Sequence, residues 1–307
     1  MVLSFQELVC SPQFTFICGD DEEPVVVHEA ALASLSPPLD RLMKGPMREA
    51  SEKMAMLPYV EKDDFLRLCE YAYRGQYTIP DAVPSATSVK RPLALGEADL
   101  EVLIAEIEKA DEEEREREKQ YERQYEKQNL AGMTAEQRMR ETKHLDGQLP
   151  LARRFVERQY IFGTPMRTEI MEGYKAKRNK HMTEDFTPIF LVHAKIYTLA
   201  GFFMIKDLEE LALENLRATL KTFRIHSTRI GDVINLVRYT YESTPDRDGE
   251  NEDVNALRQL VLEYVALNYT RIDTAEFRQL LEEGGQFVSD IWKLMRQEGL
   301  MVSPKKL

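Results

Sequence analysis

The stretch FTFICGDDEEPVVVHEAALASLS, residues 14–36, decides the fold that we expect for the first part of the chain. Phe14–Cys18 is a short run with fairly apolar faces, Gly19–Glu23 combines a glycine with acids as turns do, and Val25–Val27 is β-branched. Two short runs of this kind joined by a turn predict a β-hairpin. The leucines that follow recur at three- and four-residue steps, which predicts helix rather than a further strand.

The next residues continue the alternation of helix and strand. Pro37–Pro38 interrupts the leucine pattern, so two short helices are expected there. Lys53–Pro58 predicts a third short strand, and apolar residues at helical spacing predict a helix after it. Asp63 or Asp64 is the expected cap of that helix, and Gly75 is its expected end. The residues up to about 80 therefore predict a compact unit of mixed helix and strand.

The composition is that of a charge-rich globular protein. Its 307 residues include 41 Lys or Arg and 53 Asp or Glu, a formal net charge of −12 at pH 7. A chain this acidic binds polyanions poorly, so nucleic acid is not an expected partner. No apolar run reaches the ~18–20 residues that span a bilayer, and Met1–Cys10 lacks the basic start and apolar run of a signal peptide, so no membrane partner is expected. Cys10, Cys18 and Cys69 form no Cys-x-x-Cys pair, which favours reduced thiols and an intracellular location, in cytoplasm or nucleus.

The chain lacks the common signatures of catalysis and of cofactor binding. No Gly-x-Gly-x-x-Gly, Gly-x-x-x-x-Gly-Lys, His-Glu-x-x-His or Gly-x-Ser-x-Gly pattern occurs in it. Its five histidines are scattered, with none at ligand spacing from another. We therefore expect no enzyme, no catalytic, cofactor-binding or metal-ligating residues, no cofactor and no small-molecule substrate. The expectation is a protein that binds or scaffolds other proteins.

A charged segment follows the turn-rich residues 81–96. Glu97–Gln128 holds 13 acidic and 6 basic residues, with opposite charges at three- and four-residue spacing. This pattern predicts an exposed charged helix. A coiled coil is the alternative, although apolar positions at heptad spacing do not persist past Ile107. Residues 129–183 reverse the balance to a net charge of +5, which favours a surface stretch that pairs with the acidic helix. Its basic end, Lys175–His181, leaves a nuclear address or a phosphate contact as the alternative.

The residues after Phe186 predict a series of amphipathic helices. Apolar residues recur there at helical spacing, with polar or glycine-containing breaks between the stretches. Thr187, Asp207 and Asp273 are the expected N-caps in this part of the chain. The expected helical stretches are 188–201, 207–223, 230–243, 254–265, 277–281 and 287–295.

The order of elements in residues 14–80 resembles a BTB/POZ domain of the fungal type. The residues that carry this resemblance are Val27-His28, Leu32, Ser36, the run Phe65–Tyr77 and the run Val192–Ala200. Val27-His28 is similar to the hydrophobic–His start of the family, with Leu four residues and Ser eight residues later. Phe65–Tyr77 resembles the family's Phe…Leu…Tyr-x-Gly helix end. Val192–Ala200, followed by Leu208–Leu220, is similar to the closing helix pair of many fungal members.

The resemblance implies an organisation for the whole chain. Residues 8–80 would form the first part of the BTB/POZ domain, and residues 186–225 its closing helix pair. Residues 81–185, with the charged helix 97–128 and the basic stretch, would be an insertion between these two parts. Residues 226–307 would be a C-terminal helical region. The expected fold class is therefore α+β, a BTB/POZ fold that is mostly α overall.

The resemblance also implies a function. BTB/POZ domains are protein-interaction modules, and members that recruit cullin scaffolds for ubiquitin ligation carry a hydrophobic–x–Glu motif after the paired helices. Met47, Arg48 and Glu49 match this motif and are the candidate protein interface of a substrate adaptor. The alternative is a scaffold that associates with itself and has no ligase role, through the charged helix 97–128 or the helical half.

Two residues at the end of the second strand complete the expectations. His28 has no neighbour in the sequence suited to a ligand or acid–base role, so a structural bond to local backbone is expected. Glu29 stands where many dimeric members of the family carry Lys or Arg. The charged pocket of the usual dimer is therefore not expected in this chain.

Overall fold

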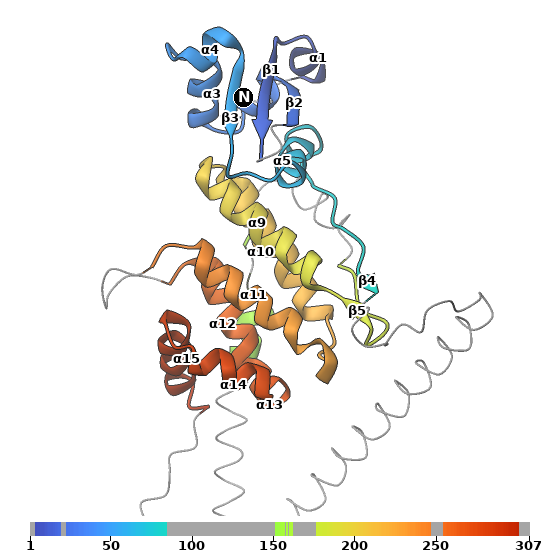
Figure 1. Ribbon diagram of the computed structural model, residues 1–307, viewed down its shortest axis with the longest axis vertical. Helices are drawn as coiled ribbons and strands as arrows, with labels where there is room; N and C mark the ends of the chain where they lie inside the picture. The colour runs from blue at the N-terminus through green and yellow to red at the C-terminus, as the bar shows by residue number, and fades with distance from the viewer. Residues whose placement is uncertain are drawn as a thin grey trace, which may run out of the picture.

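The computed structural model describes residues 4–19, 23–84, 151–156, 158, 160–161, 176–246 and 254–300. Figure 1 shows a small sheet with its helices at one end of the molecule, a long helix pair that leads away from it, and further helices at the other end. The expected α+β fold, mostly helical overall, is confirmed.

The sheet has the strand order β2-β1-β3. β1 (Gln13–Cys18) pairs antiparallel with β2 (Glu23–His28) and parallel with β3 (Met54–Leu57), which confirms the predicted hairpin and third strand. Side chains of β1 alternate between buried and more exposed positions, as a strand with one face on a core requires. The fully buried ring of Phe16 lies 4.8 Å from that of Phe65, centroid to centroid, so this face of the sheet packs on the helix that follows β3.

Short helices surround the sheet. They are α1 (Phe5–Val9), α2 (Glu29–Ala33), α3 (Pro37–Lys44), α4 (Arg48–Glu52) and α5 (Lys62–Arg74). The predicted break at Pro37–Pro38 is confirmed, and Ser36 caps α3 by accepting a backbone N–H at 3.3 Å. α5 ends as predicted at Gly75, whose φ of 71° is a left-handed conformation that glycine adopts without a Cβ clash.

α9 (Thr187–Phe202) and α10 (Lys206–Thr222) agree with the predicted helix pair to within one residue at each end. Each helix contributes one end to the core around the sheet and the other end to the core of the C-terminal helices. The first core takes Val192, Ile196, Leu199, Ala200, Leu208, Leu211 and Ala212 from the pair. The second core takes Ile189, Phe190, Ala194, Leu213, Leu216 and Leu220. Because each helix contributes buried side chains to both cores, the pair fixes the two halves of the molecule relative to each other.

The C-terminal half is helical, as predicted. Its elements are the 3-10 turn Ser227–Arg229, α11 (Ile230–Ser243), α12 (Ala256–Leu267), α13 (Tyr269–Ile272), α14 (Ala275–Glu282) and α15 (Gln286–Gln297). α11 ends at the predicted place, before Thr244–Pro245. Within the described ranges, no helix combines the length and the apolar character needed to cross a bilayer.

The predicted N-caps are wrong for α5, α9, α10 and α14. Where Asp63 or Asp64, Thr187, Asp207 and Asp273 were expected, the N-cap positions hold Glu61, Phe186, Ile205 and Thr274, respectively. Of these four, Thr274 makes a side-chain capping bond, 3.4 Å to a backbone N–H. Several polar residues stand near each helix start, and tertiary packing decides which residue is the first helical one.

The chain leaves the first half after β4 (Val83–Pro84) and returns at β5 (Glu184–Asp185), and these two short strands pair antiparallel. Lys177 Nζ donates to Asp81 at 2.5 Å and ties the two ends together. The predicted charged helix, residues 97–128, lies outside the described residues.

One described piece of the predicted insertion packs against the C-terminal helices. Residues 151–156 are helical, and Leu151 and Phe155 belong to the core of the C-terminal half. The sequence did not predict this contact, because nothing local in residues 129–183 indicates a buried partner.

Candidate protein interface

The predicted motif residues lie at the start of α4. Met47 occupies the N-cap position with an extended backbone, and its side chain is 48% exposed. Arg48 is exposed and pairs with Glu52 one turn later, at 2.7 Å. Glu49 is half-buried, and its carboxylate has no hydrogen bond or ion pair to another described residue. The turn therefore presents a free apolar side chain beside a free carboxylate.

The end of α4 is held to the start of α2 by an ion pair of Glu29. Glu29 is 3% exposed, and its Oε1 lies 2.6 Å from Nζ of Lys53. Lys53 ends α4 in a left-handed conformation, with φ 54°, and leads directly into β3. A buried carboxylate needs such a partner, so this ion pair anchors the C-terminal end of α4.

His28 has the structural role that the sequence predicted, with a different partner. The hydroxyl of Tyr73 on α5 lies 2.8 Å from His28 Nδ1 and accepts the backbone N–H of His28 at 3.1 Å. The predicted bond to local backbone is therefore replaced by a bond to a side chain 45 residues away.

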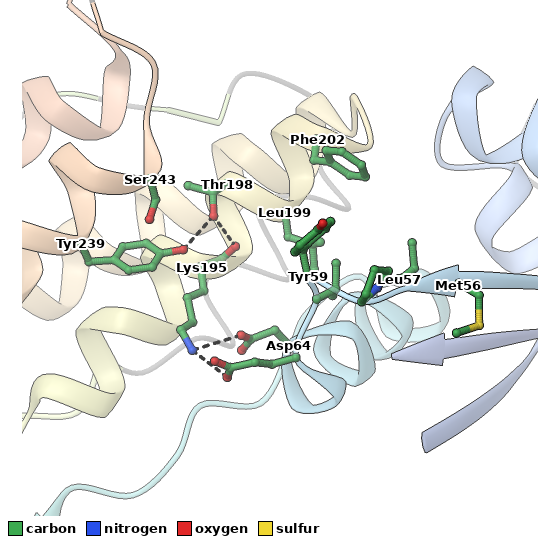
Figure 2. A pocket seen from close by; sticks show the side chains of 13 residues that line it. Met56, Leu57, Tyr59, Asp64, Lys195, Thr198, Leu199, Phe202, Tyr239 and Ser243 are labelled. Carbon is green, nitrogen blue, oxygen red and sulfur yellow. Dashed lines mark hydrogen bonds and ion pairs between the residues drawn. The ribbon is translucent and has the colours of Figure 1, made fainter. Parts of the chain in front are cut away.

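A cleft of about 610 Å³ opens between the loop after β3, α9 and the end of α11, as Figure 2 shows. Met56 and Leu57 are the last residues of β3, Tyr59 lies in the loop after it, and Leu199 and Phe202 come from α9. The exposed fractions of Tyr59 and Phe202 are 99% and 71%. Large apolar side chains this exposed are typical of surfaces that contact another protein.

The polar end of the cleft contains a charged cluster. Lys195 Nζ lies 2.7 Å from Glu61 Oε2 and 3.5 Å from Asp64 Oδ2. Burial raises the pKa of the Asp64 carboxyl against the lowering effect of Lys195. Burial acts to lower the pKa of Lys195, but the hydrogen bonds and negative charges of Glu61 and Asp64 together outweigh it, so the pKa is raised. An amine that is held charged in this way does not act as a base at neutral pH.

The family model of the BTB/POZ domain matches residues 6–98, a stretch that includes the sheet β2-β1-β3 and α2–α5. Residues 6–98 are a BTB/POZ domain. The match does not distinguish a fungal type. No curated protein and no solved structure matches this chain significantly. A BTB/POZ domain is a protein-interaction module, which agrees with the exposed apolar side chains of this part of the chain.

The motif and one wall of the cleft lie in the BTB/POZ domain, and the other wall comes from α9 and α11. None of Met47, Arg48 and Glu49 lines the cleft. The sequence did not predict the cleft, because its walls come from elements that are far apart in the chain. The sequence contained one weak signal of the cleft. Tyr59, just after β3, and Phe202, the last residue of α9, are aromatic residues at places where no local structure requires a large ring.

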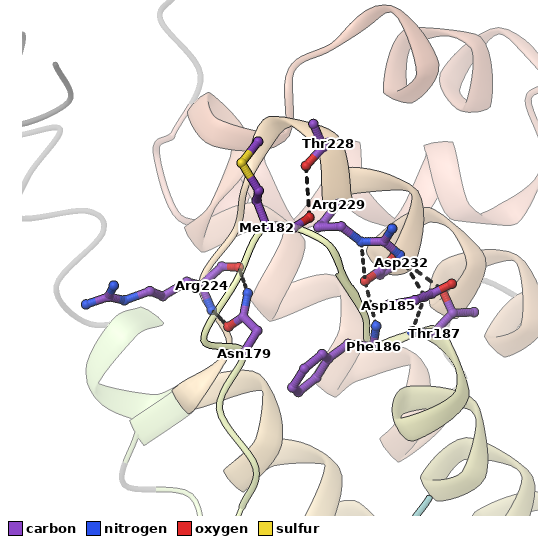
Figure 3. A network of polar contacts seen from close by, with 9 residues as sticks. All are labelled: Asn179, Met182, Asp185, Phe186, Thr187, Arg224, Thr228, Arg229 and Asp232. Carbon is purple, nitrogen blue, oxygen red and sulfur yellow. Dashed lines mark hydrogen bonds and ion pairs between the residues drawn. The ribbon is translucent and has the colours of Figure 1, made fainter. Parts of the chain in front are cut away.

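A second polar cluster lies around β5 and the start of α9 (Figure 3). Asn179 exchanges two hydrogen bonds of 2.7 Å with the backbone of Arg224. Asp232 is 2% exposed, accepts the backbone N–H of Phe186 at 2.9 Å and pairs with Arg229. Burial raises the pKa of Asp232 to about 6, although Arg229 acts to lower it. Because these groups bind one another, the cluster positions the start of α9. In the described part of the chain, no three His, Cys, Asp or Glu side chains are grouped as metal ligands.

Proposed function

We propose that this chain is a substrate adaptor whose BTB/POZ domain binds a cullin-type ubiquitin ligase scaffold at Met47–Glu49. The observation that carries the proposal is the free carboxylate of Glu49 beside the half-exposed side chain of Met47. An apolar side chain of this kind fills a pocket on a partner, and the carboxylate meets a basic or hydroxyl group there. Such a pair supplies both the buried anchor and the directional contact that protein interfaces use.

The geometry around the motif supports a fixed interface. The Lys53–Glu29 pair anchors one end of α4, so Met47 and Glu49 hold their positions before a partner arrives. A preorganised contact costs less conformational entropy on binding. The insertion or the C-terminal helices would then bind the protein to be modified.

The packing also supports a domain division. We infer that residues 8–80 and 186–225 form one interaction unit, with 81–185 as the insertion and 226–307 as the helical region. The support is the burial of α9 and α10 in the core around the sheet. The same helices enter the second core, which links the unit to the helical region.

Glu49→Arg is expected to weaken binding of the N-terminal domain of a cullin from the same organism by at least tenfold. The substitution replaces an interfacial carboxylate by a cation, and like charges opposed across an interface cost several kcal/mol, of the order of the 2–5 kcal/mol lost with a buried charge pair. Calorimetric titration of the full chain measures the change.

The matched control for that titration is Glu52→Arg, the same change of charge on the same helix. Glu52 pairs with the exposed Arg48, so binding should change less than threefold. Both variants should keep the wild-type melting temperature. Equal binding by Glu49→Arg and wild type would remove Met47–Glu49 from the interface.

The second candidate function is a self-associating scaffold with no ligase role, and the exposure of α1 favours it. α1 has no buried residue, and Phe5 and Val9 are 73% and 41% exposed. Contact of these two side chains with a second copy of the chain would bury their apolar surface.

Light scattering tests the self-associating scaffold directly. The expected result is a mass that rises with concentration toward the dimer, and Phe5→Ser should shift the rise to at least tenfold higher concentration. A strict monomer at every concentration would exclude this function and would leave the adaptor proposal untouched.

A further inference from the structure

Residues 151–156 form a short amphipathic helix on the surface of the C-terminal half (green in Figure 1). Leu151 is fully buried and Phe155 is 4% exposed, whereas Arg154 and Val156 point outward. The ring of Phe155 lies 6.0 Å from that of Tyr264 on α12, centroid to centroid. Side chains four residues apart share one face of a helix, so this helix docks through a single narrow face.

A buried arginine of α10 fixes the end of this helix. Arg217 is 8% exposed and is held by Glu214 of the same helix. Its guanidinium donates to the carbonyl of Val156 at 2.9 Å and to that of Phe155 at 3.5 Å. The last carbonyls of a helix lack partners within it and carry the negative end of its dipole. The surface of α10 around Arg217 therefore binds the C-terminal end of a helix through its backbone carbonyls. This contact does not depend on the side chains of the bound helix.

A buried carboxylate of α12 recognises a side chain just past that end. The side chain of Glu263 is fully buried and accepts from Arg158 at 2.7 Å and from Gln259 at 2.6 Å. A buried carboxylate without a cation destabilises the fold, so Glu263 requires a positive charge at the position that Arg158 occupies. At the outer edge, Arg154 pairs with Glu298 after α15 at 2.5 Å.

The segment is far in sequence from the described strands on either side of it. The 66 residues 85–150 separate it in sequence from β4, and β5 begins 26 residues after Arg158. The contacts described above join it to α10, to α12 and to the residue after α15. Two apolar side chains, a capped helix end and one buried ion pair make up the recognition.

We propose that this face of α10 and α12 is a helix-binding groove that residues 151–156 and Arg158 occupy in cis. The partner that it fits is a protein presenting an amphipathic helix with the same features, namely an aliphatic residue, an aromatic residue four positions later and an arginine three positions after that. Helices that bind in grooves are recognised through anchors at this spacing. The groove is separate from Met47–Glu49, so it does not depend on the cullin proposal.

The test uses the full chain and a fluorescent peptide of residues 149–161, followed by fluorescence polarisation. In Leu151→Ala/Phe155→Ala, the cis helix loses its anchors, so the peptide should bind at least tenfold more tightly than it binds wild type. A control peptide carrying Arg158→Glu should bind this variant at least tenfold more weakly than the matched peptide. Circular dichroism verifies that the variant is folded.

Three results would overturn the proposal. One is the absence of peptide binding by the folded variant, and another is equal binding of the two peptides. If the double variant unfolds, Arg158→Ala, which keeps both apolar anchors, takes its place, and the absence of tighter binding there counts in the same way. The third is a wild-type dimer that the variant loses, which would assign the groove to a second copy of the chain instead of a separate partner.

Discussion

Arg258→Met is expected to lower the free energy of unfolding by about 3–5 kcal/mol, the range for removing one partner from a buried charged network. Arg258 on α12 is 1% exposed and lies 4.4 Å from the ring of Tyr241. Its guanidinium donates to both oxygens of Thr244, at 2.6 and 2.8 Å, and to Gln286 at 2.5 Å. It therefore joins the end of α11 to the start of α15 through α12.

Methionine keeps much of the volume of the arginine but removes every donor, and acceptors left unpaired in the interior cost about 1–3 kcal/mol each. Urea unfolding at pH 7 measures the loss. The matched control is Arg238→Met, which breaks an ion pair with Glu283 whose partners are 37% and 40% exposed. That change should cost less than about 1 kcal/mol. Equal losses in the two variants would mean that the Arg258 network does not stabilise the helical half.

The stability of the protein is expected to fall by about 2 kcal/mol between pH 7 and pH 5 because of His193 alone. His193 on α9 is fully buried, with Nδ1 2.7 Å from the Tyr77 hydroxyl and Nε2 3.4 Å from Thr219 Oγ1. Burial lowers its pKa to about 3 from an ordinary value of 6.5. As the pH falls below 6.5, His193 is therefore protonated in the unfolded state but stays neutral in the folded state. The stabilisation is complete above pH 6.5 and is lost progressively as the pH falls toward 3.

His193→Gln removes this titration, so the pH dependence of its unfolding free energy should be smaller than that of wild type by about the same 2 kcal/mol. Asp232 acts with the opposite sign, because its raised pKa gives extra stability at low pH that is lost as the pH rises through about 6. Both proteins keep Asp232, so their difference isolates His193. Parallel pH curves would show that His193 takes up a proton in the folded state.

The elements that the sequence predicted well depend on local patterns. The hairpin of β1 and β2 follows from alternation and a turn, and the end of α5 follows from a glycine with positive φ. The N-caps were wrong because several neighbouring polar residues satisfy the same local rule. The choice among Glu61, Asp63 and Asp64 depends on where α5 packs against the rest of the fold.

The features that the sequence did not predict depend on contacts between distant residues. Lys195 meets Glu61 across 134 residues, and Arg158 meets Glu263 across 105. Each pair joins ordinary surface residue types, and no periodicity marks their partners. Met47–Glu49 was found from a local motif, and the structure adds that Met47 is exposed and that Glu49 has no described partner. Whether a cullin occupies that position stays a prediction.

Hydrogen–deuterium exchange of the full chain, with and without the cullin N-terminal domain, tests the adaptor proposal most directly. We expect that a complex forms and that exchange slows at the amides of residues 47–53. Exchange in residues 151–156, which belong to the separate groove, should stay the same. A complex that leaves residues 47–53 unprotected, or the absence of any complex with the folded protein, would contradict the binding of a cullin at Met47–Glu49.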